Sequence, residues 1–130
     1  MMLCIRTDDP HAQLFLYDKS GQQIGSIKKE LGRTMATHIL GCIEDLLQQQ
    51  DMEWNAVTGI VVYQGPGSFT GLRIGVTIAN TIAYSLQIPV LGTAGDAWIQ
   101  DGLQRLLQGD NDKTALPYYN KEANITTPRK

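Results

Sequence analysis

Three short stretches near the start of the chain have the apolar or alternating pattern of strands. They cover residues 2–7, 12–17 and 22–28. The second and third are separated by Asp-Lys-Ser-Gly at residues 18–21, a composition typical of a tight hairpin turn. The opening of the chain therefore predicts an antiparallel meander of three strands.

Two longer stretches repeat apolar residues at the spacing of a helix with one buried face. The first follows Thr34, a residue type that caps helices, and its apolar stripe is Met35, Ile39, Cys42, Ile43, Leu46 and Leu47. The second follows Ser68. Apolar runs at 57–63 and 88–92 predict two more strands on either side of it, and residues 94–107 predict a third helix, weakened by Gly102.

The resulting order is βββαβαβα. It predicts an α/β domain with a mixed five-stranded sheet and helices on its faces, the plan of an actin-like (ASKHA) or ribonuclease H-like half. We expect residues 1–108 to form this domain and residues 109–130 to form an extended C-terminal tail. The 130 residues, 42% of them hydrophobic, suffice for one core and leave no room for two.

A glycine-rich loop joins the apolar run at 57–63 to the second predicted helix. Gly65 and Gly67 allow close backbone approach, and Ser68 and Thr70 offer hydroxyls at the start of a helix, where phosphate is commonly bound. The loop lacks the lysine of a P-loop. A nucleotide-binding loop and an ordinary strand-to-helix junction both remain open.

Small residues recur every four positions in the second helix, at Gly71, Gly75, Ala79 and Ala83. Glycine inside a helix costs about 1 kcal/mol relative to alanine, so close packing should recover that cost. The neighbour is either the domain's own sheet or a helix of a second subunit. In the second case, a large residue at Gly75 or Ala79 should abolish the complex and leave the chain folded.

Composition excludes several classes of protein. The net charge of −2 and the isoelectric point near 5.6 lack the basic footprint of an independent nucleic-acid binder, so we expect any contact with RNA to be indirect and shared with a more basic partner. No apolar run approaches the ~20 residues that span a membrane, and a cytoplasmic location is expected. Cys4 and Cys42 fit reduced core thiols, and two histidines without paired spacing predict no metal or other cofactor.

Few residues suggest reactive chemistry. Asp8 and Asp9 follow the first strand and are either metal-binding carboxylates or turn formers. His38 is either a general base or a surface histidine, and Arg73 either contacts an anion or forms an ion pair at an interface. These residues assemble no catalytic set.

Residues 65–75 read Gly-Pro-Gly-Ser-Phe-Thr-Gly-Leu-Arg-Ile-Gly, which resembles the signature of the bacterial TsaB (YeaZ) family. The Thr37-His38 pair that leads the first helix and the run 88–92 resemble the same family. The resemblance covers roughly residues 2–98. It implies an actin-like fold and no catalytic residues in this chain.

The resemblance also implies a function and partners. The chain would be a scaffold subunit that stabilises a TsaD-type catalytic subunit, with a TsaE-type ATPase in a larger complex, for threonylcarbamoyladenosine (t6A) modification next to the tRNA anticodon. It assigns a partner surface to Met35, His38, Ile39, Cys42, Gly71, Arg73, Gly75 and Ala79. Alternatives are an ATPase-like protein that binds nucleotide at Gly65, Gly67, Ser68 and Thr70, and a homodimeric regulator acting alone.

The chain departs from the family pattern in two respects. Arg6-Thr7 stands where members have Asp-Thr, which predicts that any ancestral nucleotide site is lost. The chain also lacks most of the usual C-terminal domain, as either a short natural form or a fragment. A role for residues 116–130 in reaching a partner is a further guess.

Overall fold

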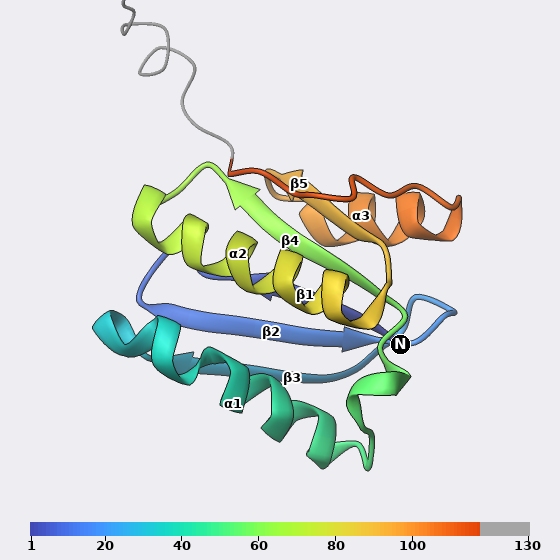
Figure 1. Ribbon diagram of the computed structural model, residues 1–130, viewed down its shortest axis with the longest axis horizontal. Helices are drawn as coiled ribbons and strands as arrows, with labels where there is room; N and C mark the ends of the chain where they lie inside the picture. Colours follow the sequence, from blue (N-terminus) through green and yellow to red (C-terminus); the bar gives the residue numbers. More distant parts are fainter. Residues whose placement is uncertain (118–130) are drawn as a thin grey trace, which may run out of the picture.

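The computed structural model describes residues 1–117 and consists of one five-stranded sheet with helices on both faces (Figure 1). The strands are β1 (Met2–Arg6), β2 (His11–Tyr17), β3 (Gln23–Glu30), β4 (Gly59–Gly65) and β5 (Val90–Ala94). The helices are α1 (Met35–Gln49), α2 (Phe69–Leu86) and α3 (Trp98–Leu107), with short 3-10 turns at Gly32–Thr34 and Trp54–Ala56.

The sheet is mixed, in the strand order β3-β2-β1-β4-β5. Strands β3, β2 and β1 are antiparallel neighbours, and β1, β4 and β5 are parallel. The predicted βββαβαβα order and the actin-like α/β class are confirmed. The parallel pairs require crossover connections, and α2 and the connection through α1 supply them.

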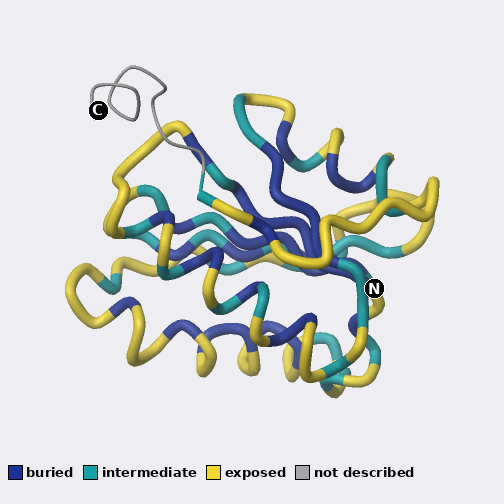
Figure 2. Tube along the Cα trace, turned by 45° about the horizontal axis from the view of Figure 1, so that its top comes forward, coloured by how far each residue is buried: buried dark blue, intermediate teal, exposed yellow. Residues whose placement is uncertain are grey.

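The sheet separates the core into two layers, one beneath α1 and α2 and one beneath α3. Alternate residues of β1 and β2, such as Leu3, Ile5 and Leu14, pack under α1 and α2. The opposite face carries Cys4 and Val61 beneath Trp98 of α3. Figure 2 shows the central part of the sheet buried, mainly β1, β4 and β5, and the outer sides of the helices exposed. No helix among residues 1–117 is long and apolar enough to cross a bilayer.

Several element boundaries and one helix cap differ from the predictions. The helix expected from residue 94 begins at Trp98, because β5 continues through Ala94 and the buried Thr93 hydroxyl donates to the Trp98 carbonyl at 2.7 Å. Thr34 does not cap α1 with its side chain. Its hydroxyl donates to the Leu31 carbonyl at 2.6 Å, within the 3-10 turn that precedes the helix.

The described part of the expected tail lies along the outer edge of β5. The Asp112 N–H donates to the Val90 carbonyl at 2.9 Å, and the Asp112 carboxylate accepts from the Gly92 N–H at 2.9 Å. The Asn80 side chain of α2 both donates to and accepts from the backbone of the buried Ala115. Residues 109–117 therefore cover the β5 edge, and the rest of the expected tail lies outside the described residues.

Both cysteines are buried and unpaired, as the sequence predicts. Burial raises the pKa of the Cys4 thiol above its ordinary value of 9.0. The folded chain thus keeps a proton that the unfolded chain releases above about pH 9, so stability falls as pH rises. Above about pH 9, we expect the free energy of unfolding of the wild type to fall with pH by about 1.4 kcal/mol per pH unit more steeply than that of Cys4→Ala. Urea unfolding at pH values from about 8 to 10.5 measures both slopes. Equal pH slopes would contradict this result.

Candidate partner-binding site

The ridge of small residues on α2 packs against the end of β1. A Cβ atom at Gly71 would overlap the Thr7 carbonyl oxygen, and one at Gly75 would overlap the Thr7 hydroxyl. The Thr7 hydroxyl donates to the Gly71 carbonyl at 2.6 Å, so strand and helix are joined at this point. Ala79 and Ala83 continue the same buried line. The ridge therefore contacts the chain's own sheet.

This packing corrects most of the expected partner surface. Met35, Ile39, Cys42, Gly75 and Ala79 are buried within the chain, and Gly71 is half-buried against Thr7. Their assignment to an exposed partner surface is wrong because their side chains, or the space beside the glycines, belong to the core. Of the expected set, only His38 and Arg73 are exposed.

Thr7 is one residue whose role the sequence analysis did not predict. It is almost fully buried although it is polar, and both its hydroxyl and its carbonyl oxygen lie against α2. The available signal was a polar residue at the end of an apolar strand, combined with glycines four residues apart on a helix. A buried hydroxyl needs a partner, and bare backbone is one.

The loop before α2 wraps around the β1–β2 turn. Gly67 lies directly against the Asp8 side chain, and the Ser68 N–H donates to the Asp8 carbonyl at 3.3 Å. The Asp8 carboxylate accepts two hydrogen bonds from Arg6, at 2.7 and 3.1 Å. The Arg6 guanidinium also stacks over the Tyr63 ring, 3.9 Å from its centroid. This junction is filled by the chain's own charged pair.

Hydrogen bonds and burial shift the pKa values of three side chains at and beside this junction. The hydrogen bond to Asp8 raises the pKa of Arg6, and burial raises the pKa of Tyr63, whose hydroxyl donates to the Pro66 carbonyl at 2.6 Å. Asp9 accepts from the His11 N–H at 2.7 Å, which lowers the pKa of Asp9. Both carboxylates thus act in the turn, the second of the two alternatives left open above.

Two of the four residues of the predicted nucleotide loop, Gly65 and Ser68, form local hydrogen bonds. Ser68 Oγ accepts from the Gly71 N–H at 3.5 Å and so caps α2, and the Gly65 carbonyl accepts from the Gly95 N–H at 3.2 Å. Thr70 is exposed and lines a groove on α2. The Asp8 side chain, paired with Arg6, occupies the space beside Gly67 where a phosphate would approach the loop, which argues against the nucleotide-binding alternative. Within residues 1–117, no three His, Cys, Asp or Glu side chains cluster as a metal site.

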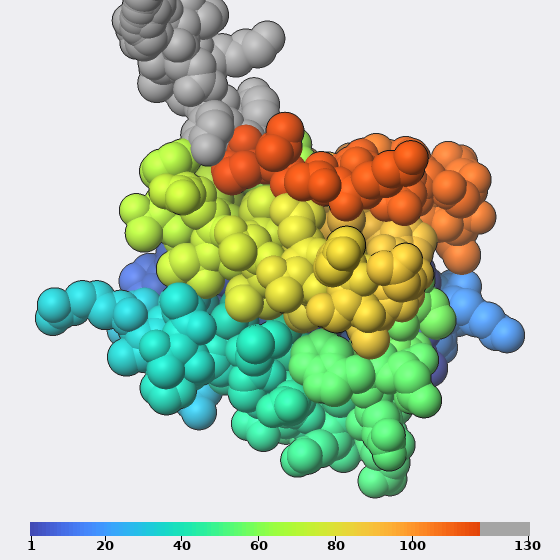
Figure 3. Space-filling view, in the orientation of Figure 1, coloured from blue at the N-terminus to red at the C-terminus, as the bar shows by residue number. Residues whose placement is uncertain are grey.

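The outer faces of α1 and α2 form a continuous surface (Figure 3). A groove of about 280 Å³ lies between the helices, lined by Ala36, Thr70, Arg73, Ile74, Thr77 and Ile78. Leu40 on α1 is 43% exposed and Tyr84 on α2 is 80% exposed. The groove itself is lined by small and apolar side chains with one guanidinium, that of Arg73. These groove residues, unlike most of the predicted partner-surface residues, are exposed or half-buried.

The two exposed residues of the expected partner surface, His38 and Arg73, lie in different hollows. Arg73 lines the groove and places its guanidinium 5.4 Å from the centre of the Phe69 ring. His38 lies on the other side of α1, in a hollow shared with Lys29 and Gly41. The groove brings Arg73 next to Ile74 and Thr77, residues that the sequence analysis did not select.

Comparison with known proteins places the chain in a family. The family model for TsaD, tRNA N6-adenosine threonylcarbamoyltransferase, matches residues 20–94. TsaB proteins, described as tRNA threonylcarbamoyladenosine biosynthesis proteins, are similar in sequence. The one from Bacillus subtilis is 43% identical over 60 residues, 46% of this chain and 26% of that protein. The one from Escherichia coli is 32% identical over 93 residues, 67% of this chain and 40% of that protein.

A solved structure agrees with the sequence matches. YeaZ from Pseudomonas aeruginosa superposes with a TM-score of 0.65 at 30% identity, over 72% of this chain and 43% of that one. The chain belongs to the TsaB (YeaZ) family. This TsaB-family chain therefore has the predicted ancestry and fold. It spans between about a quarter and two fifths of the length of the two curated TsaB relatives described here.

Proposed function

We propose that the chain acts in tRNA threonylcarbamoyladenosine biosynthesis as a non-catalytic subunit that binds a TsaD-type catalytic subunit. The observation that carries the proposal is the exposed groove between α1 and α2, two helices that also carry the exposed side chains of Leu40 and Tyr84. Exposed apolar side chains that gather on one face mark interaction sites. The names of the TsaB relatives supply the pathway.

The chemistry of the groove suits a helical partner. Ile74 and Ile78 are half-buried one helical turn apart, with Thr77 between them on the solvent side and Ala36 facing them from α1. Small residues beside bulky ones let another pair of helices pack ridge into groove. Because the model that matches this chain describes TsaD itself, a TsaD-type subunit has helices of the same plan to offer.

The proposal assigns the chemical step to the partner. In this chain the position nearest to a phosphate loop is taken by the Arg6–Asp8 pair, and Asp8 lies against Gly67. Contact with tRNA and with a TsaE-type ATPase would then come through the TsaD-type subunit. This agrees with the slightly acidic chain, which carries a net charge of −2.

The test places a charge in the centre of the groove. Thr77 is exposed, so Thr77→Arg should leave the chain folded but bury an unpaired guanidinium in the complex. We expect its affinity for the TsaD-type subunit of the same genome to fall by about 100-fold, measured by titration calorimetry.

The matched control is Gln100→Arg, an exposed position on α3 across the sheet, which should bind as wild type does. Wild-type affinity in Thr77→Arg would refute the proposed surface. A homodimer, detected by light scattering, that Thr77→Arg dissociates while the TsaD-type subunit never binds would favour the homodimeric alternative.

A further inference from the structure

The two edge strands of the sheet, β5 and β3, differ in whether their outer backbone groups are hydrogen-bonded. On β5, the backbone of Val90 and Gly92 bonds to Asn111 and Asp112 from the segment after α3. On β3, eight residues long, no segment of the described chain pairs with the outer side. A free edge presents unpaired N–H and C=O groups that can template another strand. Within residues 1–117, β3 is therefore the open edge of the sheet.

The pairing of β3 with β2 determines which backbone groups face outward. The Leu31 N–H donates to the Pro10 carbonyl at 2.9 Å, one residue beyond the pair of His11 with Glu30. In an antiparallel ladder, bonded and non-bonded pairs alternate. Counting back from Leu31, the residues Ser26, Lys28 and Glu30 therefore direct their N–H and C=O groups to the free edge.

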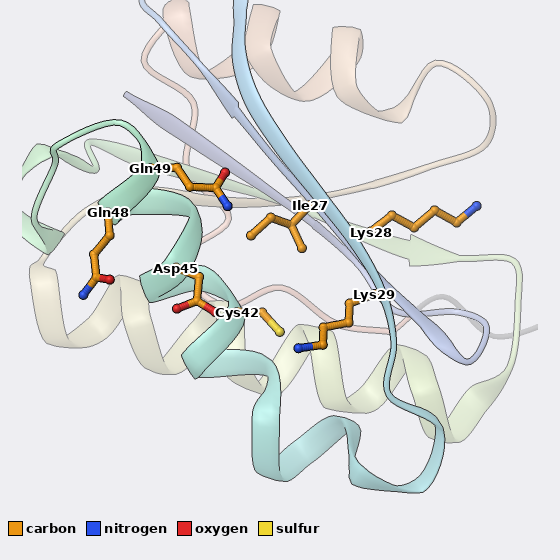
Figure 4. Close-up of a pocket in the computed structure, with 7 residues that line it drawn as sticks. All are labelled: Ile27, Lys28, Lys29, Cys42, Asp45, Gln48 and Gln49. Carbon is orange, nitrogen blue, oxygen red and sulfur yellow. The ribbon is translucent and has the colours of Figure 1, made fainter.

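Helix α1 forms a groove beside this edge (Figure 4). The groove has a volume of about 550 Å³ and is lined by Ile27, Lys28, Lys29, Cys42, Asp45, Gln48 and Gln49. In the close-up, Ile27 and Lys29 point from β3 toward α1, whereas Lys28 points away. A second hollow of about 420 Å³ shares Lys29 and Cys42 and extends the groove to Gly41.

The groove carries charges that the chain leaves unused. Lys29 and Asp45 line both hollows, and neither forms an ion pair with another described residue. A polypeptide in the groove can pair with both. A second copy of β3 is a poor occupant, because it would bring another Lys28-Lys29 pair to the same seam, and like charges across paired strands destabilise them.

We propose that β3 and α1 form a strand-addition site for an extended segment of a partner protein. The segment bonds to Ser26, Lys28 and Glu30 as a further strand. Its alternate side chains enter the groove, with an apolar residue over Ile27 and Cys42 and an acidic residue opposite Lys29. Main-chain bonds supply affinity and alternate side chains supply specificity in such complexes. The site does not rest on the proposed function.

The test uses a peptide probe and nuclear magnetic resonance. The probe is the end-capped peptide Thr-Val-Thr-Glu-Thr-Val-Thr, whose valines and glutamate share one face. Titrated into the labelled full chain, it should shift the amide signals of Ser26, Lys28 and Asp45. Lys28→Pro removes an outward N–H and leaves the β2 pairing intact, so the dissociation constant should rise about tenfold or more. Lys28→Ala, which keeps the N–H, should change it by no more than about threefold.

A charge exchange tests the groove independently of the proline variant. In Lys29→Glu, we expect the preference to pass to the peptide with lysine in place of glutamate. Equal binding of both peptides by Lys29→Glu, wild-type affinity in folded Lys28→Pro, or no amide shift at millimolar probe would overturn the proposal. Shifts confined to the α1–α2 groove would also overturn it.

Discussion

Replacing Gly75 by leucine is expected to unfold the chain, at a cost of roughly 4 kcal/mol or more. A Cβ at this position overlaps the Thr7 hydroxyl, which is fixed by its bond to the Gly71 carbonyl at 2.6 Å. Thr7 directly follows β1, which is paired on both sides, so it has little freedom to withdraw. A loss of this size approaches the total stability of a small domain, about 5 to 15 kcal/mol. Urea unfolding followed by circular dichroism measures it.

The matched control is Gly41→Ala in α1. No atom lies within 4 Å of a Cβ at that glycine, so alanine should stabilise the chain by up to about 1 kcal/mol. A folded Gly75→Leu with wild-type stability would return the ridge to a partner surface, the alternative that this structure corrects. Substitution of a helical glycine is thus expected to lower or raise the stability of the chain according to what lies opposite that glycine.

Replacing Gly102 by alanine is expected to cost about 3 kcal/mol. The sequence suggests only that this glycine weakens α3, which alone would predict that alanine stabilises it. In the structure, a Cβ at Gly102 overlaps a methyl group of Val61 on β4, so the glycine lets α3 lie directly on the sheet. The free energy of unfolding in urea should therefore fall.

A double-mutant cycle identifies the cause. In a Val61→Ala background the opposing methyl groups are absent, so Gly102→Ala should cost about 2 kcal/mol less than in wild type. Additive costs of the two substitutions would show that the loss has another origin. The sign of the Gly102→Ala effect by itself separates helix propensity from helix-to-sheet contact.

The sequence predicts the order of elements well because most of them have a strong periodic pattern. The stripe on α1 and the alternation on β2 correspond to buried faces in the structure. Where the periodic pattern is weak, the sequence does not define the ends of an element. The start of α3 depends on the Thr93 hydroxyl bonded to Trp98, a contact between neighbouring elements that no propensity expresses.

The candidate site was less predictable, because burial depends on which element lies opposite. The four-residue repeat of small side chains on α2 indicates close packing, but it cannot say whether β1 or another molecule occupies the space. The family signature at 65–75 likewise identifies relatives without assigning a role to each of its residues. The sequence pattern assigns buried core residues to a partner surface and does not single out Thr77, whose place in a groove depends on α1 lying beside α2.

The fold class and the family can be inferred from the sequence alone, because periodicity and a contiguous signature are local properties of the chain. The packed structure is needed to see what the glycines face, which surface stays exposed and which sheet edge is unpaired among residues 1–117. These depend on contacts between residues far apart in the chain, such as Thr7 with Gly71 and Asn80 with Ala115. Such contacts exist only once the elements have packed.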